Sequence, residues 1–243
     1  MSATKTKGTI KIVYLYPNEM NIYGDWGNVL TLSKRLEWHG YTPEIIQHHI
    51  GSSLPKDSDI IIGGGGQDSS QKVVEADLLK NQQKIHALAN DNVPMLVVCG
   101  LYQLFGKKFT TSDNSVIEGI GLFNFETFGS AKRLVGNITV ETPFGEVIGY
   151  ENHSGKTILD ASQPAFGTVK RGNGNNGNDK TEGAVFKNAY GTYMHGSVLP
   201  KNPAFADALI QKAVERKFGE FEPNIIDDSF AEKARMVAKR RPR

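Results

Sequence analysis

The amino-acid sequence predicts a single-domain α/β fold in which a mostly parallel sheet carries helices on both faces. From Thr9 onward, short β-rich runs alternate with stretches of helical length, as they do in parallel sheets. A run of four glycines and the single cysteine, Cys99, each follow an apolar run directly. Both therefore belong at the carboxyl ends of strands, where ligands of such sheets bind, and one shared site is expected there.

The N-terminal part begins with a β-rich run at Thr9–Tyr16, which predicts the first strand. Asp25 or Asn28 is suited to cap the helix that follows, and Gly40 is suited to end it. A second strand is predicted at Thr42–His48. Together these segments form one strand–helix–strand unit.

The chain continues with a third strand at Ser58–Gly63 and a helix at about 70–90. The segment 93–98 is apolar almost throughout, which is typical of a buried parallel strand. This strand leads into Cys99, and a further helix is predicted to start near Tyr102.

The pattern changes in the second half of the chain, where residues 138–142 and 146–151 alternate like strands. The glycine- and asparagine-rich segment 172–179 is interpreted as a mobile connection between two strands. A helix is predicted at 203–217, and a basic helix closes the chain.

One domain is expected over residues 9–218, with a flexible N-terminus (1–8) and a basic extension (219–243). Hydrophobic residues make up 39% and charged residues 22%, and a net charge of +2 gives no general attraction to nucleic acid or membranes. One cysteine excludes an intramolecular disulfide. Neither a signal-peptide core nor a membrane span of about 18 apolar residues is recognisable, so a cytoplasmic location is expected.

Cys99 is the candidate nucleophile of the expected site. Backbone N–H groups and the dipole of the following helix are expected to lower the pKa of its thiol. A cysteine nucleophile also needs a base, and His195, at the end of a predicted strand, is the candidate. The alternatives are an inert buried thiol and a satisfied core histidine. The other histidines singled out are expected at the surface: His39, His48, His49 and His86.

Glycine-rich turns can present backbone N–H groups to the oxyanion that such a nucleophile generates. The N–H of Gly100 is one candidate donor, and that of Gly64 or Gly65 is the other. The run Gly63–Gly66 lacks the last glycine of a dinucleotide-binding fingerprint, and a plain tight turn is the alternative. Arg133 is a candidate for binding a substrate carboxylate, or else a solvated charge. No metal site is expected.

Several segments occur in an order that resembles a known family. They are Asn21–Asn28, Gly63–Gly66, Val97–Gly106, Gly119–Leu122, Arg133–Gly136, Gly149–Gly155 and Gly191–Lys201. Over nearly its whole length the chain resembles the class I glutamine amidotransferase domain of the cobyric acid synthase type. Within that type it is similar to glutaminase subunits of two-protein enzymes that amidate the second-position glutamate of the lipid II stem peptide.

The resemblance implies a flavodoxin-like core and a role for each candidate. Cys99 would attack the carboxamide of L-glutamine and hold a γ-glutamyl thioester, and His195 would carry the proton to the departing ammonia. Gly100, with Gly64 or Gly65, would stabilise the oxyanion. Arg133 would bind the α-carboxylate. Gln103 lies one helical turn beyond Cys99 and would line the substrate pocket.

Two departures from the family pattern suggest a partner. The family places a glutamate two residues after the histidine, where this chain has Ser197, so the site is either a Cys–His dyad or another group supplies the acid; our hypothesis is that a partner subunit supplies it. No Walker-type motif is present, so ATP is expected on a Mur-ligase-like synthetase that forms a heterodimer with this chain and binds lipid II as acceptor. The basic tail and Asn21–Asn28 are candidate docking surfaces.

Three alternatives to lipid II amidation remain at this point. The ammonia can serve another acceptor, as in amidation of a tetrapyrrole of the cobyric acid type. The chain can be a stand-alone γ-glutamyl hydrolase. It can also be a binding module without catalysis, in which case Cys99 would be dispensable.

Overall fold

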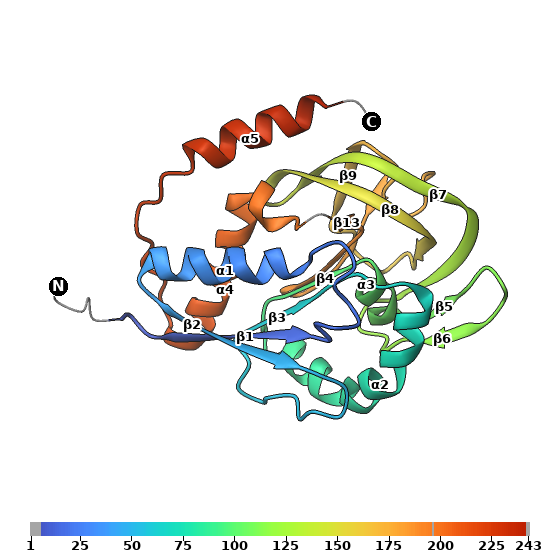
Figure 1. Cartoon of the computed structure of the whole chain (residues 1–243), viewed down its shortest axis with the longest axis horizontal. Coiled ribbons are helices and arrows are strands. Elements are labelled where there is room, and N and C mark those ends of the chain that lie inside the picture. Colours follow the sequence, from blue (N-terminus) through green and yellow to red (C-terminus); the bar gives the residue numbers. More distant parts are fainter. Residues whose placement is uncertain (1–5, 196, 242–243) are drawn as a thin grey trace.

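The computed structural model describes residues 6–195 and 197–241, and a six-stranded sheet lies at its core (Figure 1). The strand order is β11-β12-β4-β3-β1-β2, and every neighbouring pair is parallel except β11 with β12. The predicted mostly parallel sheet is therefore confirmed. Its strands are β1 (Thr9–Leu15), β2 (Thr42–His48), β3 (Ile60–Gly63), β4 (Met95–Val98), β11 (Ala184–Phe186) and β12 (Ala189–Thr192).

Helices cover both faces of this sheet, as predicted. In Figure 1, α1 and α4 lie on one face and α2 lies on the other. The helices are α1 (Trp26–His39), α2 (Asp68–Asn90), α3 (Gly100–Phe105), α4 (Pro203–Phe218) and α5 (Ser229–Arg240), with a 3₁₀ turn, η1, at Leu199–Lys201. Among the described residues, none of these helices has both the length and the apolar character needed to cross a lipid bilayer.

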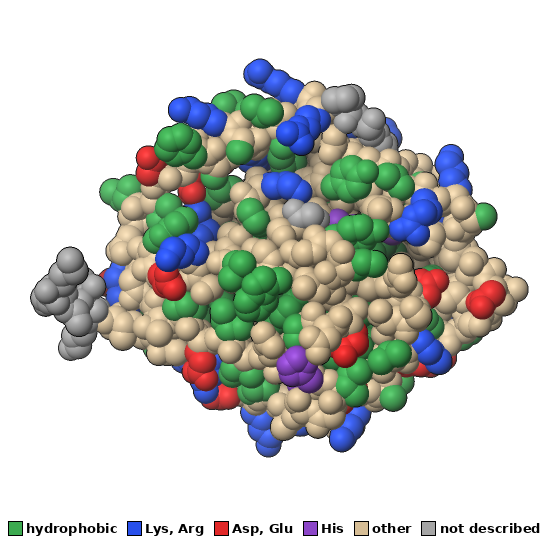
Figure 2. All heavy atoms as spheres, viewed as in Figure 1, with side chains coloured by type: hydrophobic (Ala, Val, Ile, Leu, Met, Phe, Trp, Pro, Cys, Tyr) green, Lys and Arg blue, Asp and Glu red, His purple; other side chains and the backbone are tan. Residues whose placement is uncertain are grey.

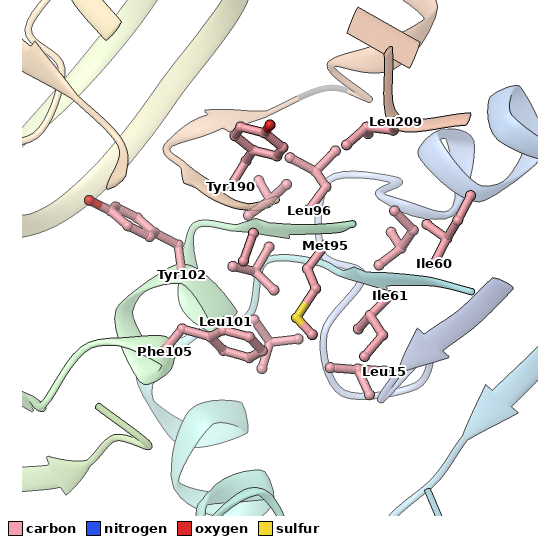
Figure 3. Close-up of a cluster of buried hydrophobic side chains, with 14 of the residues drawn as sticks. Leu15, Ile60, Ile61, Met95, Leu96, Leu101, Tyr102, Phe105, Tyr190 and Leu209 are labelled. Carbon is pink, nitrogen blue, oxygen red and sulfur yellow. The ribbon is translucent and has the colours of Figure 1, made fainter. Parts of the chain in front are cut away.

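Apolar strand residues fill the space between the sheet and its helices (Figure 3). Ile60, Ile61, Met95 and Leu96 are all fully buried. Successive side chains of a strand point to opposite faces of the sheet. Because helices cover both faces, these strands are continuous runs of apolar residues. Burying each such side chain stabilises the fold by roughly 1.5–3 kcal/mol. The packing holds the ends of β3 and β4 in place, and with them the residues that follow.

The alternating segments of the second half form a separate, seven-stranded sheet that the sequence did not predict. Its main element is a long antiparallel hairpin of β7 and β8. The short strand β13 pairs with β8, so the chain crosses from the first sheet to the second directly after β12. The seven strands are β5 (Lys108–Thr110), β6 (Val116–Glu118), β7 (Phe125–Thr142), β8 (Gly145–Leu159), β9 (Gly167–Arg171), β10 (Thr181–Glu182) and β13 (Met194–His195).

The structure corrects the interpretation of segment 172–179 as a mobile connection. Asn175 is fully buried. The carboxylate of Glu151, on β8, accepts hydrogen bonds from the backbone N–H groups of Asn173 and Gly174. Buried backbone groups need partners, and here side chains supply them in place of a regular ladder. The asparagines that suggested a flexible loop are therefore the groups that hold it.

Two histidines expected at the surface are buried, so that prediction is wrong for them. The Nε2 atom of His39 lies 3.2 Å from Asp207 Oδ1, and that of His48 lies 3.1 Å from Asp77 Oδ2. Each carboxylate comes from a helix far along the chain, so the pairing is invisible in the local sequence pattern. The remaining two, His49 and His86, are half-buried.

The two ends of the chain differ in how they contact the rest of the molecule. Of the expected flexible segment 1–8, residues 1–5 lie outside the described residues, while the Lys7 N–H donates to Gly40 O at 2.9 Å. The basic extension contains α5, which stands apart from the sheet in Figure 1. Lysine and arginine side chains lie along this part of the surface in Figure 2. Two apolar side chains of α5, Phe230 and Val237, are exposed to solvent.

Candidate active site

Cys99 lies in the sharp turn between β4 and α3. Its φ of +49° and ψ of −101° fall outside the regions that residues with a side chain favour. The Cys99 N–H donates to the carbonyl of Thr192, on β12, at 2.8 Å, which secures the turn against the neighbouring strand. α3 begins at Gly100, directly after the cysteine and two residues before the predicted start near Tyr102.

The surroundings of Cys99 do not activate its thiol in the free chain. Burial raises the pKa of the thiol well above its ordinary value, and the nearby Asp25 carboxylate raises it further. Arg133 and the Gly100 N–H lower this pKa, but by less than burial raises it. The expected net lowering is therefore wrong: α3 has only six residues, and the sulfur is shielded from water. The resting thiol is protonated at neutral pH.

His195 reaches the same place from the second sheet, as part of β13. An ideal Cβ on Gly65 would lie 2.9 Å from His195 Cε1 and 3.3 Å from Cys99 Cβ, so both side chains pack against this glycine. Burial lowers the pKa of His195 to about 3, with smaller contributions from His153 and Arg133. The structure thus brings the two predicted catalytic residues together as a neutral thiol and a neutral imidazole.

The structure differs from the prediction for the oxyanion donors of the glycine run after β3, which were expected to be Gly64 or Gly65. The Gly65 N–H donates to Asp25 Oδ2 at 2.9 Å, so this hydrogen is already used. Gly64 contacts Asp25 as well, and neither glycine lines the cavity in front of Cys99. Gly66 does line this cavity. If Gly100 carried a Cβ atom, that atom would lie 2.8 Å from the amide nitrogen of Gly66. The N–H groups that the structure places beside the nucleophile are those of Gly66 and Gly100.

A cavity of about 530 Å³ opens in front of the nucleophile. It is lined by Ile22, Tyr23, Gly66, Gln67, Asp68, Ser69, Gln71, Cys99, Gln103, Arg133, Asn152, His153 and Ser154. Arg133 is exposed, and its Nε and Nη2 atoms donate to Asn152 Oδ1 at 3.1 and 2.9 Å. Asn152 in turn donates to the Tyr23 hydroxyl at 2.9 Å. The predicted carboxylate-binding arginine is therefore held over the cavity by the second sheet.

Gln103 forms part of the cavity floor, where it is 3% exposed. Its Oε1 accepts from Gln71 Nε2 at 2.8 Å, and its Nε2 donates to the Tyr193 hydroxyl at 3.2 Å. These bonds fix the orientation of the Gln103 amide. The ring of His153 stacks on that of Tyr193 with centroids 3.6 Å apart, and burial lowers the pKa of His153 to about 4.

Reasoning from the sequence assigned no role at the site to several residues that the structure places there. Asp25 secures the glycine run, and Tyr23 packs its ring edge-on against His195 with centroids 4.4 Å apart. Both belong to the segment Asn21–Asn28, which stood out only through the family resemblance. Its nearness to Cys99 depends on how the loop after β1 folds back over the sheet.

His195 has an unusual environment for a catalytic base. Neither of its ring nitrogens has a hydrogen-bond partner among the described residues. Ser197, at the position where the family has glutamate, donates to the carbonyl of Gly24 at 2.7 Å. His195 also lines a second cavity of about 330 Å³, together with Lys201, Lys239 and other residues. Access to the imidazole from a side away from Cys99 is therefore available.

Glu182 supports the strand that carries His195 and yields a test by pH. Its Oε1 accepts from the Tyr193 N–H at 2.7 Å, and burial raises its pKa from 4.5 to about 8. Between these two values the folded chain keeps a proton that the unfolded chain has released, so stability falls as pH rises. We expect the free energy of unfolding, measured by urea titration from about pH 5 to about pH 8, to fall less in Glu182→Gln than in the wild type. Parallel pH profiles would contradict the assigned shift.

No group of three or more His, Cys, Asp or Glu side chains is placed to hold a metal ion in the part of the chain that the structure describes. The cavity in front of Cys99 instead holds a nucleophile and an arginine, and the His195 imidazole and the N–H groups of Gly66 and Gly100 lie beside the nucleophile. Such a set can attack a carbonyl carbon and stabilise the oxyanion that results.

Comparisons with known proteins agree with this chemistry. The family model of the CobB/CobQ-like glutamine amidotransferase domain matches residues 11–203. The chain is 36% identical over 230 residues, 94% of each chain, to the "Lipid II isoglutaminyl synthase (glutamine-hydrolyzing) subunit GatD" of Staphylococcus aureus. It is also 36% identical to the protein of that name from Streptococcus pneumoniae, over 87% of this chain and 83% of the relative.

Solved structures share the fold at low sequence identity. PurLQS from Thermotoga maritima matches with a TM-score of 0.57 and 14% identity, over 85% of this chain and 98% of that one. The glutaminase domain of Trypanosoma brucei CTPS, with bound acivicin, matches with a TM-score of 0.53 and 10% identity, over 90% and 98%. At these identities the likeness concerns the fold alone.

Proposed function

Because the chain belongs to the CobB/CobQ-like glutamine amidotransferase family, we propose that it is the glutaminase subunit of a lipid II isoglutaminyl synthase. In this role it hydrolyses L-glutamine to glutamate and ammonia, and the ammonia is used to amidate the D-glutamate of the lipid II stem peptide. The observation that carries the catalytic part is the packing of Cys99, which lines the first cavity, and His195 against the same glycine, Gly65.

The extent of similarity favours this acceptor over a tetrapyrrole. The match to the Staphylococcus aureus subunit covers 94% of that protein. The match to the probable cobyric acid synthase of Methanosphaera stadtmanae has 30% identity and covers 31% of that protein. The alternative of cobyric acid-type amidation is therefore less supported.

Because Cys99 and His195 are both neutral at rest, the first chemical step includes a proton transfer between them. His195 takes the thiol proton as the Cys99 sulfur attacks the carboxamide carbon of glutamine, and the N–H groups of Gly66 and Gly100 stabilise the oxyanion. His195 then returns the proton to the departing ammonia, which leaves a γ-glutamyl thioester on the sulfur. Water attacks the thioester, and glutamate is released. Arg133 binds the α-carboxylate throughout, and Gln103 shapes the pocket floor.

A partner subunit completes this scheme. We assign it the synthetase half of the reaction: a Mur-ligase-like chain that binds ATP and lipid II in the cytoplasm. Its carboxylate would reach His195 through the second cavity, which His195 lines. The exposed apolar side chains of α5 and the segment Asn21–Asn28 are the proposed docking surfaces.

Dependence on the partner is the test of this function. We expect glutamate release from L-glutamine to rise by a factor on the order of 10² or more when the Mur-ligase-like partner is added, because an unoriented histidine is a poor base. Equal rates with and without the partner would contradict the shared site. Absence of glutamate release in both cases would contradict the glutaminase assignment, and cleavage of γ-glutamyl peptides by the chain alone would favour the hydrolase alternative.

A further inference from the structure

The cavity in front of Cys99 is lined by two ionised side chains of opposite sign, Asp68 and Arg133. Asp68 is the first residue of α2, and Arg133 lies on β7 of the second sheet. The charge of Arg133 acts on the pKa of Asp68, and both charges act on the pKa of Cys99. The two side chains form no salt bridge with each other in the part of the chain that the structure describes. Both nevertheless line the same cavity as Cys99.

Asp68 and Arg133 can each form further interactions with a ligand. The guanidinium of Arg133 uses Nε and Nη2 on Asn152, and no bond of its Nη1 atom is found among the described residues. The carboxylate of Asp68 forms no ion pair within the described part of the chain, although burial raises its pKa. A partly buried carboxylate without a cation is costly, so a cationic ligand group would be bound favourably there.

The rest of the lining is neutral. The pKa of His153 is lowered to about 4, so its imidazole carries no charge at neutral pH. The amides of Gln71 and Gln103 are bonded to each other on the floor. The cavity thus offers one positive and one negative group together with a nucleophile, which matches the ammonium and carboxylate on the α-carbon of a free amino acid.

We propose that Asp68 binds the α-ammonium group of free L-glutamine while Arg133 binds its α-carboxylate. This assignment rests on the proposed glutaminase function for the identity of the substrate. It makes Asp68 a specificity-determining residue, because glutamine within a peptide, or with an acylated amino group, has no α-ammonium to offer. Together the two charges orient the side-chain carboxamide toward the Cys99 sulfur.

A purely structural role for Asp68 makes a different prediction. An acidic residue in the first turn of a helix interacts favourably with the helix dipole. If that were the whole role, substitution would change the stability of α2 and affect all substrates alike. Discrimination between ligands that differ only in the amino group would then be unchanged.

The test compares L-glutamine with glutaramate, which is glutamine without its amino group, by ammonia release from the chain together with its Mur-ligase-like partner. For the wild type we expect kcat/KM to be about 10- to 100-fold higher for glutamine, since a hydrogen bond to a charged group has about this effect. In Asp68→Asn the ratio should approach one, through a higher KM for glutamine. Asp68→Glu should retain part of the preference, and Glu141→Gln, which changes an exposed acid outside the cavity, should retain all of it.

The outcomes separate this inference from the proposed function. A wild-type ratio that persists in Asp68→Asn, or a wild type that does not distinguish the two ligands, would overturn the role of Asp68 while leaving the glutaminase assignment intact. No ammonia from either ligand with the wild-type complex would overturn both. Because each variant serves as its own reference, a loss of folded protein cannot mimic a change in the ratio.

Discussion

Replacement of Cys99 by serine is expected to lower glutamine hydrolysis by a factor on the order of 10⁴ or more, because no other group in the cavity can form the thioester. A serine hydroxyl ionises far less readily than a thiol, and the buried turn that already raises the thiol pKa would disfavour an alkoxide further. The substitution leaves the turn itself in place, since the bond from residue 99 to Thr192 is made by the backbone.

Two measurements check this result. Glutamate release is followed for both chains together with the partner, and thermal unfolding shows whether the serine variant is folded. Acid quenching of the wild type with L-glutamine should trap a γ-glutamyl group on the peptide that contains Cys99, detectable by mass spectrometry. A serine variant with substantial activity, or a γ-glutamyl group on another residue, would refute Cys99 as the nucleophile.

Glu151→Gln is expected to lower the free energy of unfolding by about 2–4 kcal/mol. The Glu151 carboxylate is fully buried and accepts hydrogen bonds from the Asn173 N–H, the Asn173 side-chain amide and the Gly174 N–H. A glutamine at this position has one acceptor oxygen and places an NH₂ group against one or more of these donors. Buried donors that lose their partners bear the full cost of desolvation.

Urea unfolding of Glu151→Gln and of a matched control measures this effect. Glu141→Gln, on the neighbouring strand β7, removes the charge of an exposed carboxylate and should change stability by no more than about 0.5 kcal/mol. Equal unfolding midpoints for the two variants would show that the carboxylate does not hold segment 172–179. Its buried asparagines would then have to be secured by other bonds.

Much of the first sheet and its helices could be predicted from sequence because local patterns specify them. The run before Cys99 must be apolar to be covered on both faces, and Gly40, with a φ of +90°, marks the end of α1 because glycine adopts this conformation at little cost. The short connections between strands and helices also place the glycine run and Cys99 at the same edge of the first sheet. The second sheet was not predictable in this way, because its pairings join segments whose alternation is equally compatible with one extended sheet.

The amino-acid sequence by itself determined the parallel core, the strand-to-helix turn at Cys99 and the residue types available for catalysis, because these follow from local patterns of polarity and turn residues. Only the tertiary structure decided the electrostatics of the site. Burial, which depends on every packed element, raises the thiol pKa of Cys99 and lowers that of His195. The bond from the Gly65 N–H to Asp25, and the placement of Asp68 and Arg133 in the lining of one cavity, likewise join residues far apart in the chain. Such contacts leave no periodic signal in the sequence, because the fold alone sets the distance between their partners.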